Sequence, residues 1–251
     1  MQNNILSVII PIFNAKASLI RCIDSVVLQD LTPEQGKSSI ADSLELILVD
    51  DGSTDGSAEL CENIKRQYED DSCHIVVLHQ QHAGVWAARK AGFEASTGEL
   101  VTFIDADDFL GKNTYSKQME FFQCADDVDV VEFPVAKFYN EFLKKEVIEH
   151  AVDFYSSFEN YLYDTKTKGH TFIFNKIFKR QMLISDSGDA NLQSAMTWLS
   201  KARRIVTNDG GMYFYTYSPN GLPYEKNMQQ IEHKFSTKEL IMRKLKKICK
   251  L

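Results

Sequence analysis

The chain has 251 residues, of which 44% are apolar and 25% are charged, as is ordinary for a soluble globular protein. This length suits one domain with a small appended element, and the apolar content excludes disorder for most of the chain. The formal net charge of −7 argues against nucleic acid as a partner.

The first half of the chain alternates apolar runs with helical patterns. Four short apolar runs predict buried strands at residues 5–10, 44–49, 74–78 and 100–104, the first ended by Pro11. Apolar residues at helical spacing predict helices at residues 15–28, 55–68 and 83–95. The polar stretch 30–43 is expected to be a loop. This order predicts an α/β fold with a mostly parallel central sheet flanked by helices.

The second half is less regular, and it shows no internal repeat or linker. We expect a strand at 129–133, a hairpin within 137–150, a helix at 190–202 and a strand at 212–217. The aromatic residues of the last strand are typical of a core, and they also suit stacking on a sugar ring. We therefore expect a single domain over residues 1–235, divided into halves 1–110 and 111–235.

Cysteine usage and the first residues bear on the compartment. The five cysteines are widely spaced and form no CxxC pair, which favours a reducing compartment and argues against a zinc site. The first residues lack a basic leader, and no stretch reaches the ~18 apolar residues that a membrane span needs. We therefore expect a cytoplasmic protein.

Polar and acidic residues follow each predicted strand of the first half, in the segments 11–14, 50–53, 79–84 and 105–108. Because ligands bind at the carboxyl ends of the strands in an open parallel sheet, these segments should meet at one site. Helix caps and turns would explain one such cluster equally well. Four clusters in phase along one edge favour a ligand site.

The cluster Asp105-Ala106-Asp107-Asp108 predicts a divalent metal. Three carboxylates within four residues repel one another unless a cation joins them, and oxygen ligands suit Mg²⁺ or Mn²⁺. A DxD triplet also occurs by chance and in calcium loops, but its place after an apolar strand favours the metal site. Arg89, in the helix at 83–95, belongs either to a solvated helical face or to a clamp on a diphosphate.

Three segments closely resemble the family 2 glycosyltransferases, which have the glycosyltransferase-A fold. They are SVIIPIFNA at 7–15, ELILVDDGSTDGS at 45–57 and HAGVWAARKAGFEASTGELVTFIDADDF at 82–109. The resemblance covers about residues 5–110, with fainter matches in FNKIFKR, LSKARRIV and MYFYTY. It implies that residues 1–110 bind a nucleotide-sugar and that residues 111–235 form the acceptor side. Pro11, Phe13 and Asn14 would line the base pocket.

The resemblance also assigns the acidic residues and Arg89. Either Asp50 or Asp51 would accept a hydrogen bond from the base, most often uracil in this family. Arg89 would meet the diphosphate, Asp105 would touch the ribose or the metal, and Asp107 would bind the metal.

The chain departs from the family pattern in three places. The loop 30–43 is longer than usual, and His82 stands where the family often has Asn. The family's Glu-Asp pair, whose Asp is the catalytic base, falls near Asp189. If the alignment with the family allows two extra residues in this chain, Asp189 is the base. If the alignment has no gap, Ala190-Asn191 take the place of the Glu-Asp pair and the base is missing. Asp189 also fits a helix N-cap.

The resemblance implies metal-dependent transfer of a sugar, with inversion, from a nucleotide-diphospho-sugar to a hydroxyl of a glycan or lipid-linked acceptor. The donor would be UDP-linked, as is usual in this family. The QxxRW motif of processive polymer synthesis is absent, which favours one sugar per acceptor in cell-surface glycan synthesis. The alternative is a catalytically impaired nucleotide-sugar-binding protein of the same fold. A dinucleotide-binding or nucleotidyltransferase site would need a glycine-rich loop, and Pro11-Ile12-Phe13-Asn14-Ala15 supplies none.

Residues 236–251 predict a basic amphipathic helix. From residue 237 onward six Lys or Arg and one Glu give +5, so the rest of the chain carries −7 − 5 = −12. Such a helix either lies on an anionic membrane, which would place the protein at the inner membrane face, or packs on the domain with its bases solvated.

Vesicle flotation separates these two roles of residues 236–251. The full chain should float with anionic vesicles at low salt and be released as salt rises, because salt screens surface charges. A chain ending at Phe235 should stay behind. Equal flotation of both forms, or none of either, would show that the segment is not a membrane anchor.

Overall fold

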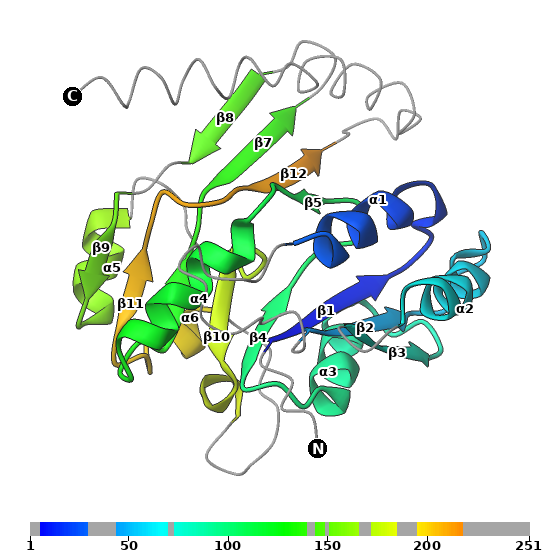
Figure 1. The fold of residues 1–251 in the computed structure, drawn as a ribbon, viewed down its shortest axis with the longest axis horizontal. Coiled ribbons are helices and arrows are strands. Elements are labelled where there is room, and N and C mark those ends of the chain that lie inside the picture. Colours follow the sequence, from blue (N-terminus) through cyan, green and yellow to red (C-terminus); the bar gives the residue numbers. More distant parts are fainter. Residues whose placement is uncertain are drawn as a thin grey trace.

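The computed structural model of the chain describes residues 6–29, 44–69, 73–139, 144–148, 151–165, 172–184 and 195–217. They form two β-sheets with helices packed around them, which confirms the predicted α/β class (Figure 1). The predicted loop 30–43, Asp189 and the segment 236–251 lie outside the described residues. No helix among the described residues is long and apolar enough to cross a membrane.

The larger sheet has eight strands in the order β3-β2-β1-β4-β10-β6-β11-β9. Its first four strands in that order are parallel to one another: β3 (Cys73–His79), β2 (Leu44–Asp50), β1 (Leu6–Ile12) and β4 (Leu100–Phe103). The other four mix directions: β10 (Lys176–Lys179), β6 (Val130–Glu132), β11 (Ile205–Thr207) and β9 (Asp153–Tyr155). β10 pairs with both β4 and β6, so one sheet runs through both predicted halves of the chain.

Helices cover both faces of the parallel strands. Alternate residues of β1 pack into separate clusters, one with α1 (Lys16–Val27) and α2 (Ser57–Tyr68), and the other with α3 (Val85–Ala95). Strands buried on both faces read as continuous apolar runs, which is why the sequence located all four strands and three helices of this region.

The first strand runs to Ile12, two residues beyond its predicted last residue Ile10. Pro11 pairs in register with Val49 of β2, and Ile12 pairs with Asp50. On the other side, the pairing of β1 with β4 stops at Ile9, whose carbonyl accepts from Ile104. Proline has no N–H to donate, and at Pro11 no residue of β4 remains to accept a hydrogen bond, so the strand loses nothing there.

The smaller sheet has the order β5-β12-β7-β8 and lies above α1 in Figure 1. Its strands are β5 (Phe109–Leu110), β12 (Tyr213–Tyr217), β7 (Val135–Tyr139) and β8 (Lys144–Ile148). The antiparallel β7 and β8 confirm the predicted hairpin, which begins at Val135, and β12 confirms the last predicted strand.

Several elements from Phe109 onward were not predicted. They are the strands β5, β9, β10 and β11, the helices α4 (Thr114–Cys124) and α5 (Phe158–Thr165), and the 3₁₀ turn Arg180–Leu183. The helix expected at 190–202 is α6 (Ala195–Leu199) within the described residues. The missed strands have two to four residues, too few to show a period in the sequence.

Candidate active site

A cavity of about 400 Å³ opens where β1 and β4 end and α3 begins. This is the carboxyl edge of the parallel strands, where ligands bind in open α/β sheets. Nine residues were predicted to form the site, and six of them line this cavity: Pro11, Phe13, Asn14, Arg89, Asp105 and Asp107. Asp50 and Asp51 are not among its lining residues, and Asp189 lies outside the described residues.

Arg89 and Asp105 form an ion pair at the cavity wall. An Arg89 Nη2 donor lies 2.6 Å from Asp105 Oδ1, and the guanidinium also packs over the Trp86 ring, 4.9 Å from its centroid. The Arg89 side chain is 9% exposed, and its Nε has no hydrogen-bond partner among the described residues. A guanidinium carries five N–H donors, so this pair leaves donors for an anion in the cavity.

Asp107 differs from its acidic neighbours because its side chain is exposed and the described residues give it no ion pair. Desolvation at the cavity wall, followed by the negative charge of Asp105, raises the pKa of Asp107. Its main-chain carbonyl accepts a hydrogen bond from Arg21 Nη2 at 2.5 Å, which fixes the backbone without occupying the carboxylate. A bound cation would favour the charged form of this carboxylate.

The donor set fits a divalent metal only as an incomplete shell. Among the described residues, no group of three or more His, Cys, Asp or Glu side chains is arranged to hold a metal ion. Asp105 and Asp107 supply two carboxylates at the cavity. Mg²⁺ is commonly held by one or two carboxylates, with water and substrate phosphates completing the shell. The pair therefore suits a metal that arrives with a phosphate ligand.

Asp51 is buried and bound within the protein. Its oxygens accept hydrogen bonds from the main-chain N–H of Ala83 at 2.9 Å and of Gly84 at 2.8 Å. Gln80 Nε2 donates at 2.6 Å, and His82 Nδ1 lies 2.8 Å away. Burial favours the protonated form, but these donors outweigh it and lower the pKa of Asp51. Asp51 therefore fixes the loop 79–84 that leads into α3.

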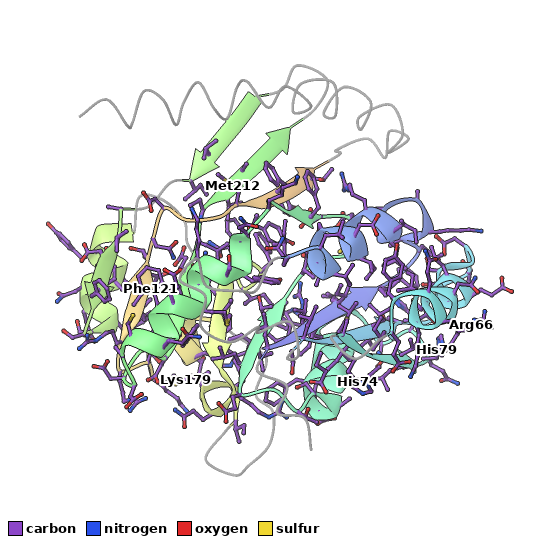
Figure 2. All side chains as sticks on the ribbon, in the orientation of Figure 1. Arg66, His74, His79, Phe121, Lys179 and Met212 are labelled. Carbon is purple, nitrogen blue, oxygen red and sulfur yellow. The ribbon has the colours of Figure 1, made fainter. Side chains whose placement is uncertain are left out.

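Asp50 is also buried, at 3% exposure. It accepts from the Ser53 main-chain N–H at 3.2 Å and lies 3.4 Å from His79 Nδ1, at the carboxyl end of β3 (Figure 2). Both acidic residues at the end of β2 thus stabilise strand ends. The partners of Asp51 come from the loop after β3, and Asp50 lies beside the last residue of β3, neighbours that the sequence of β2 alone does not reveal.

Phe13 and Asn14 shape one mouth of the cavity. Phe13 stacks on His82 with ring centroids 4.1 Å apart and is 48% exposed. Asn14 has a left-handed backbone with φ 51°, which Asn tolerates better than most residues. Its Oδ1 accepts from the Thr54 main-chain N–H at 2.8 Å, which joins the loops after β1 and β2. An apolar ring face is therefore presented beside a rigid turn.

Tyr215 is a cavity residue that the sequence did not single out from its strand. It lines the cavity opposite the acidic loop, and its ring stacks on Phe174 at 5.6 Å and 12°. Tyr213, two residues earlier on the same face of β12, is fully buried. Tyr213 thus belongs to the core, as expected for this aromatic strand, whereas Tyr215 faces the cavity.

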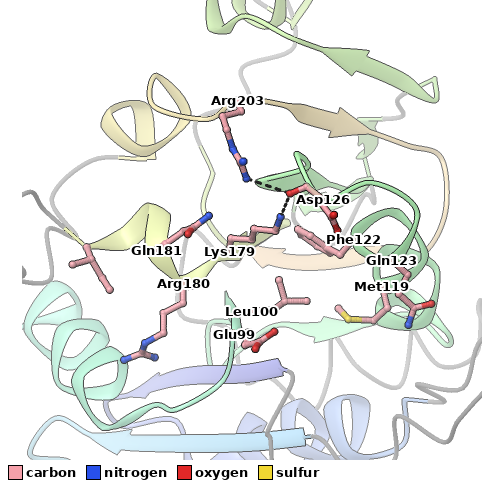
Figure 3. Close-up of a pocket in the computed structure, with 11 residues that line it drawn as sticks. Glu99, Leu100, Met119, Phe122, Gln123, Asp126, Lys179, Arg180, Gln181 and Arg203 are labelled. Atoms are coloured by element: carbon pink, nitrogen blue, oxygen red, sulfur yellow. Dashed lines mark hydrogen bonds between the residues drawn. The ribbon is translucent and has the colours of Figure 1, made fainter.

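A second cavity, of about 760 Å³, lies at the amino end of β4, away from the acidic loop (Figure 3). Its cations are held by the protein. Lys179 and Arg203 donate to the Asp126 carbonyl, Arg203 pairs with Asp129 at 2.6 Å, and Arg180 donates to the Phe93 carbonyl. The size of this cavity does not make it the site, because the predicted residues line the smaller one.

Solved structures share this fold. TarS from S. aureus, residues 1–349 in complex with UDP-GlcNAc, matches with a TM-score of 0.64 and 19% identity, over 86% of this chain and 59% of that chain. The mannosyltransferase PcManGT from Pyrobaculum calidifontis, in complex with GDP-Man and Mn2+, matches with a TM-score of 0.60 and 17% identity, over 86% and 58%. At these identities the likeness shows the fold alone.

Curated relatives match over parts of their length. The uncharacterized glycosyltransferase YibD of Escherichia coli is 38% identical over 52% of this chain and 34% of its own. The minor teichoic acid biosynthesis protein GgaA of Bacillus subtilis is 27% identical over 83% and 46%. The chain therefore spans about a third and about half of these two relatives. The family model for glycosyl transferase family 2 matches residues 7–185, and the chain belongs to this family.

Proposed function

We propose that the chain transfers a sugar from a nucleotide-diphospho-sugar, UDP-linked, to a hydroxyl of a glycan or lipid-linked acceptor in cell-surface glycan synthesis. The observation that carries this proposal is the cavity that joins the Arg89–Asp105 pair to the exposed Asp107 at the carboxyl edge of the sheet. Family membership supports it, as do neighbours solved with UDP-GlcNAc and with GDP-Man and Mn2+, and the teichoic acid relative.

Two parts of the cavity lining suit the two ends of such a donor. The exposed ring of Phe13, with Pro11 and Asn14 beside it, offers a flat apolar surface for a nucleobase. Arg89 lines the cavity, its Nε has no hydrogen-bond partner among the described residues, and a guanidinium recognises phosphate oxygens well. A divalent metal, Mg²⁺ or Mn²⁺, held by Asp107 with Asp105, would supply positive charge against the leaving diphosphate.

The reaction we propose is a single displacement with inversion. A base takes the proton of the acceptor hydroxyl, the oxygen bonds to the anomeric carbon, and the nucleoside diphosphate leaves from the opposite face. Asp189 is our candidate for the base. Arg89 is already paired and buried before the donor arrives, so its charge needs little reorganisation as the diphosphate departs.

The alternative, a nucleotide-sugar binder without transferase activity, follows from the altered Glu-Asp pair. It predicts that the protein binds a donor in the presence of metal and neither transfers the sugar nor hydrolyses the donor. Binding and turnover are therefore measured separately in each test below.

The metal role of Asp107 is tested with a donor panel. Wild type should gain thermal stability from one of UDP-glucose, UDP-GlcNAc or GDP-mannose in the presence of Mn²⁺, since saturation at 100 times Kd adds about 2.7 kcal/mol. Asp107→Asn should lose this gain and lower turnover by about a hundredfold or more. Asp209→Asn, at an exposed carboxylate away from the cavity, is the control. A full metal-dependent gain in Asp107→Asn would show that another group binds the metal.

Asp51→Asn tests whether Asp51 supports the loop or contacts the base. Ala83 and Gly84 donate to different oxygens of Asp51. An Asn amide would replace one of these oxygens with an NH₂ group that opposes the N–H facing it, so we expect a loss of about 1–3 kcal/mol in urea unfolding. Asp107→Asn should change stability by less than about 0.5 kcal/mol. Wild-type stability together with a selective loss of UDP binding would instead assign Asp51 to the base.

The catalytic role of Asp189 is tested by Asp189→Asn. Turnover should fall by ~10²–10⁴-fold with little change in donor affinity, because general base catalysis contributes about that much. Asn preserves most of a helix cap, so a structural role would be retained. Asp186→Asn in the same segment is the matched control. Unchanged turnover in Asp189→Asn would move the base to another residue.

A further inference from the structure

The third carboxylate of the acidic loop has different partners from the first two. Asp108 Oδ2 accepts a hydrogen bond from the Tyr213 hydroxyl at 2.6 Å, and Oδ1 accepts from the Thr216 main-chain N–H at 2.7 Å. The Tyr213 oxygen in turn accepts from the main-chain N–H of Asp105 at 3.2 Å. One hydroxyl thus joins both ends of the acidic loop to β12.

Asp108 and Tyr213 are both fully buried, and neither Asp108 nor Tyr213 lines the cavity. Both Asp108 oxygens are directed to β12, so this carboxylate is turned away from the side where Asp105 and Asp107 face the ligand space. Water cannot replace these hydrogen bonds at a buried position, so losing one leaves an unpaired polar group.

The strand at the other end of this contact also reaches the cavity. β12 belongs to the smaller sheet, and its Tyr215 lines the cavity wall. Phe174 stacks on Tyr213 at 4.4 Å and on Tyr215 at 5.6 Å, so the three rings form one packed unit. Tyr213 and the wall that Tyr215 provides therefore pack against the same ring.

Helix α1 holds the acidic loop from a second direction. Arg21 donates to the Asp107 carbonyl, and the Cys22 thiol lies 3.6 Å from the Asp105 carbonyl. These contacts use main-chain atoms, as does the Tyr213 contact with the Asp105 N–H. The backbone of the loop is thus fixed between α1 and β12, and the carboxylates of Asp105 and Asp107 remain at the cavity.

From this arrangement we infer that Asp108 and Tyr213 form a tether that positions the metal-binding loop against the acceptor-side sheet. Asp108 is a positioning residue and not a third metal ligand. The metal part of this inference rests on the proposed function. The tether itself does not, and its structural test needs no donor.

The first test removes only the hydroxyl. Tyr213→Phe keeps the ring stacked on Phe174, and Tyr68→Phe is the matched control because Tyr68 makes a similar 2.7 Å bond to Asp24 between α1 and α2. Hydrogen–deuterium exchange of the full chain without ligand should rise about tenfold at 104–110 and at 213–217 together in Tyr213→Phe. Tyr68→Phe should leave both peptides unchanged. Exchange that stays at the wild-type rate in Tyr213→Phe would overturn the tether.

The second test separates positioning from metal binding. Asn at position 108 can accept from Thr216 and donate to the Tyr213 oxygen, which keeps the loop joined to β12 but leaves the Tyr213 O–H without its acceptor, so exchange in Asp108→Asn should rise less than in Tyr213→Phe. Two values should change less than twofold in Asp108→Asn. One is the Mn²⁺ concentration that gives half-maximal turnover, and the other is the Mn²⁺ concentration that gives half-maximal binding in the presence of UDP, measured by electron paramagnetic resonance. In Tyr213→Phe both should rise about tenfold, with most turnover restored by excess Mn²⁺.

The two assays give distinct failures. Loss of Mn²⁺ binding in Asp108→Asn, as severe as in Asp107→Asn, would make Asp108 a metal ligand and overturn the positioning role. If wild type binds no Mn²⁺ with UDP, the proposed function fails in its UDP form, and the exchange experiment still decides whether the tether exists.

Discussion

Carboxylates gathered at one edge of a parallel sheet repel one another, and burying any of them without a partner is costly. The fold resolves this by giving each acidic residue of the edge a different neighbour. Asp51 accepts hydrogen bonds from main-chain N–H groups of the loop 79–84, and Asp105 forms an ion pair with Arg89. Asp108 accepts hydrogen bonds from two residues of β12. Asp107 keeps an exposed carboxylate with no ion pair among the described residues. In the proposed function, this division leaves Asp107 as the carboxylate that takes up a cation.

The partners come from elements far apart in the sequence, so the site depends on the whole fold. Arg89 lies on α3, the loop amides follow β3, and Tyr213 lies more than a hundred residues beyond the acidic loop. β12 reaches the loop because it pairs with β5, which directly follows the acidic loop. The smaller sheet therefore does more than extend the core, since it supplies both a hydrogen-bond partner and one wall of the cavity.

Sequence patterns were sufficient where one element carries the signal. The parallel strands, α1 to α3 and six cavity residues followed from apolar runs, helical spacing and the rule that ligands meet strand ends. The patterns could not show that the Asp51 carboxylate is hydrogen-bonded to the main chain of Ala83 and Gly84, or that Tyr213 is buried whereas Tyr215 lines the cavity. The first outcome depends on how the loop 79–84 packs against the end of β2, and the second on the pairing of β5 with β12, strands of two and five residues that leave almost no period in the sequence.

The formal charges at the cavity explain why a metal fits the proposed chemistry. Arg89 and Asp105 neutralise each other, so Asp107 leaves the wall with one negative charge. A nucleotide-diphospho-sugar brings two more negative charges, and three charges of one sign in a partly buried space oppose binding. In the proposed function, a divalent cation would reduce that sum to one. Arg89 is already paired with Asp105, so the proposed cation, taken up with the donor, would offset the charge of Asp107.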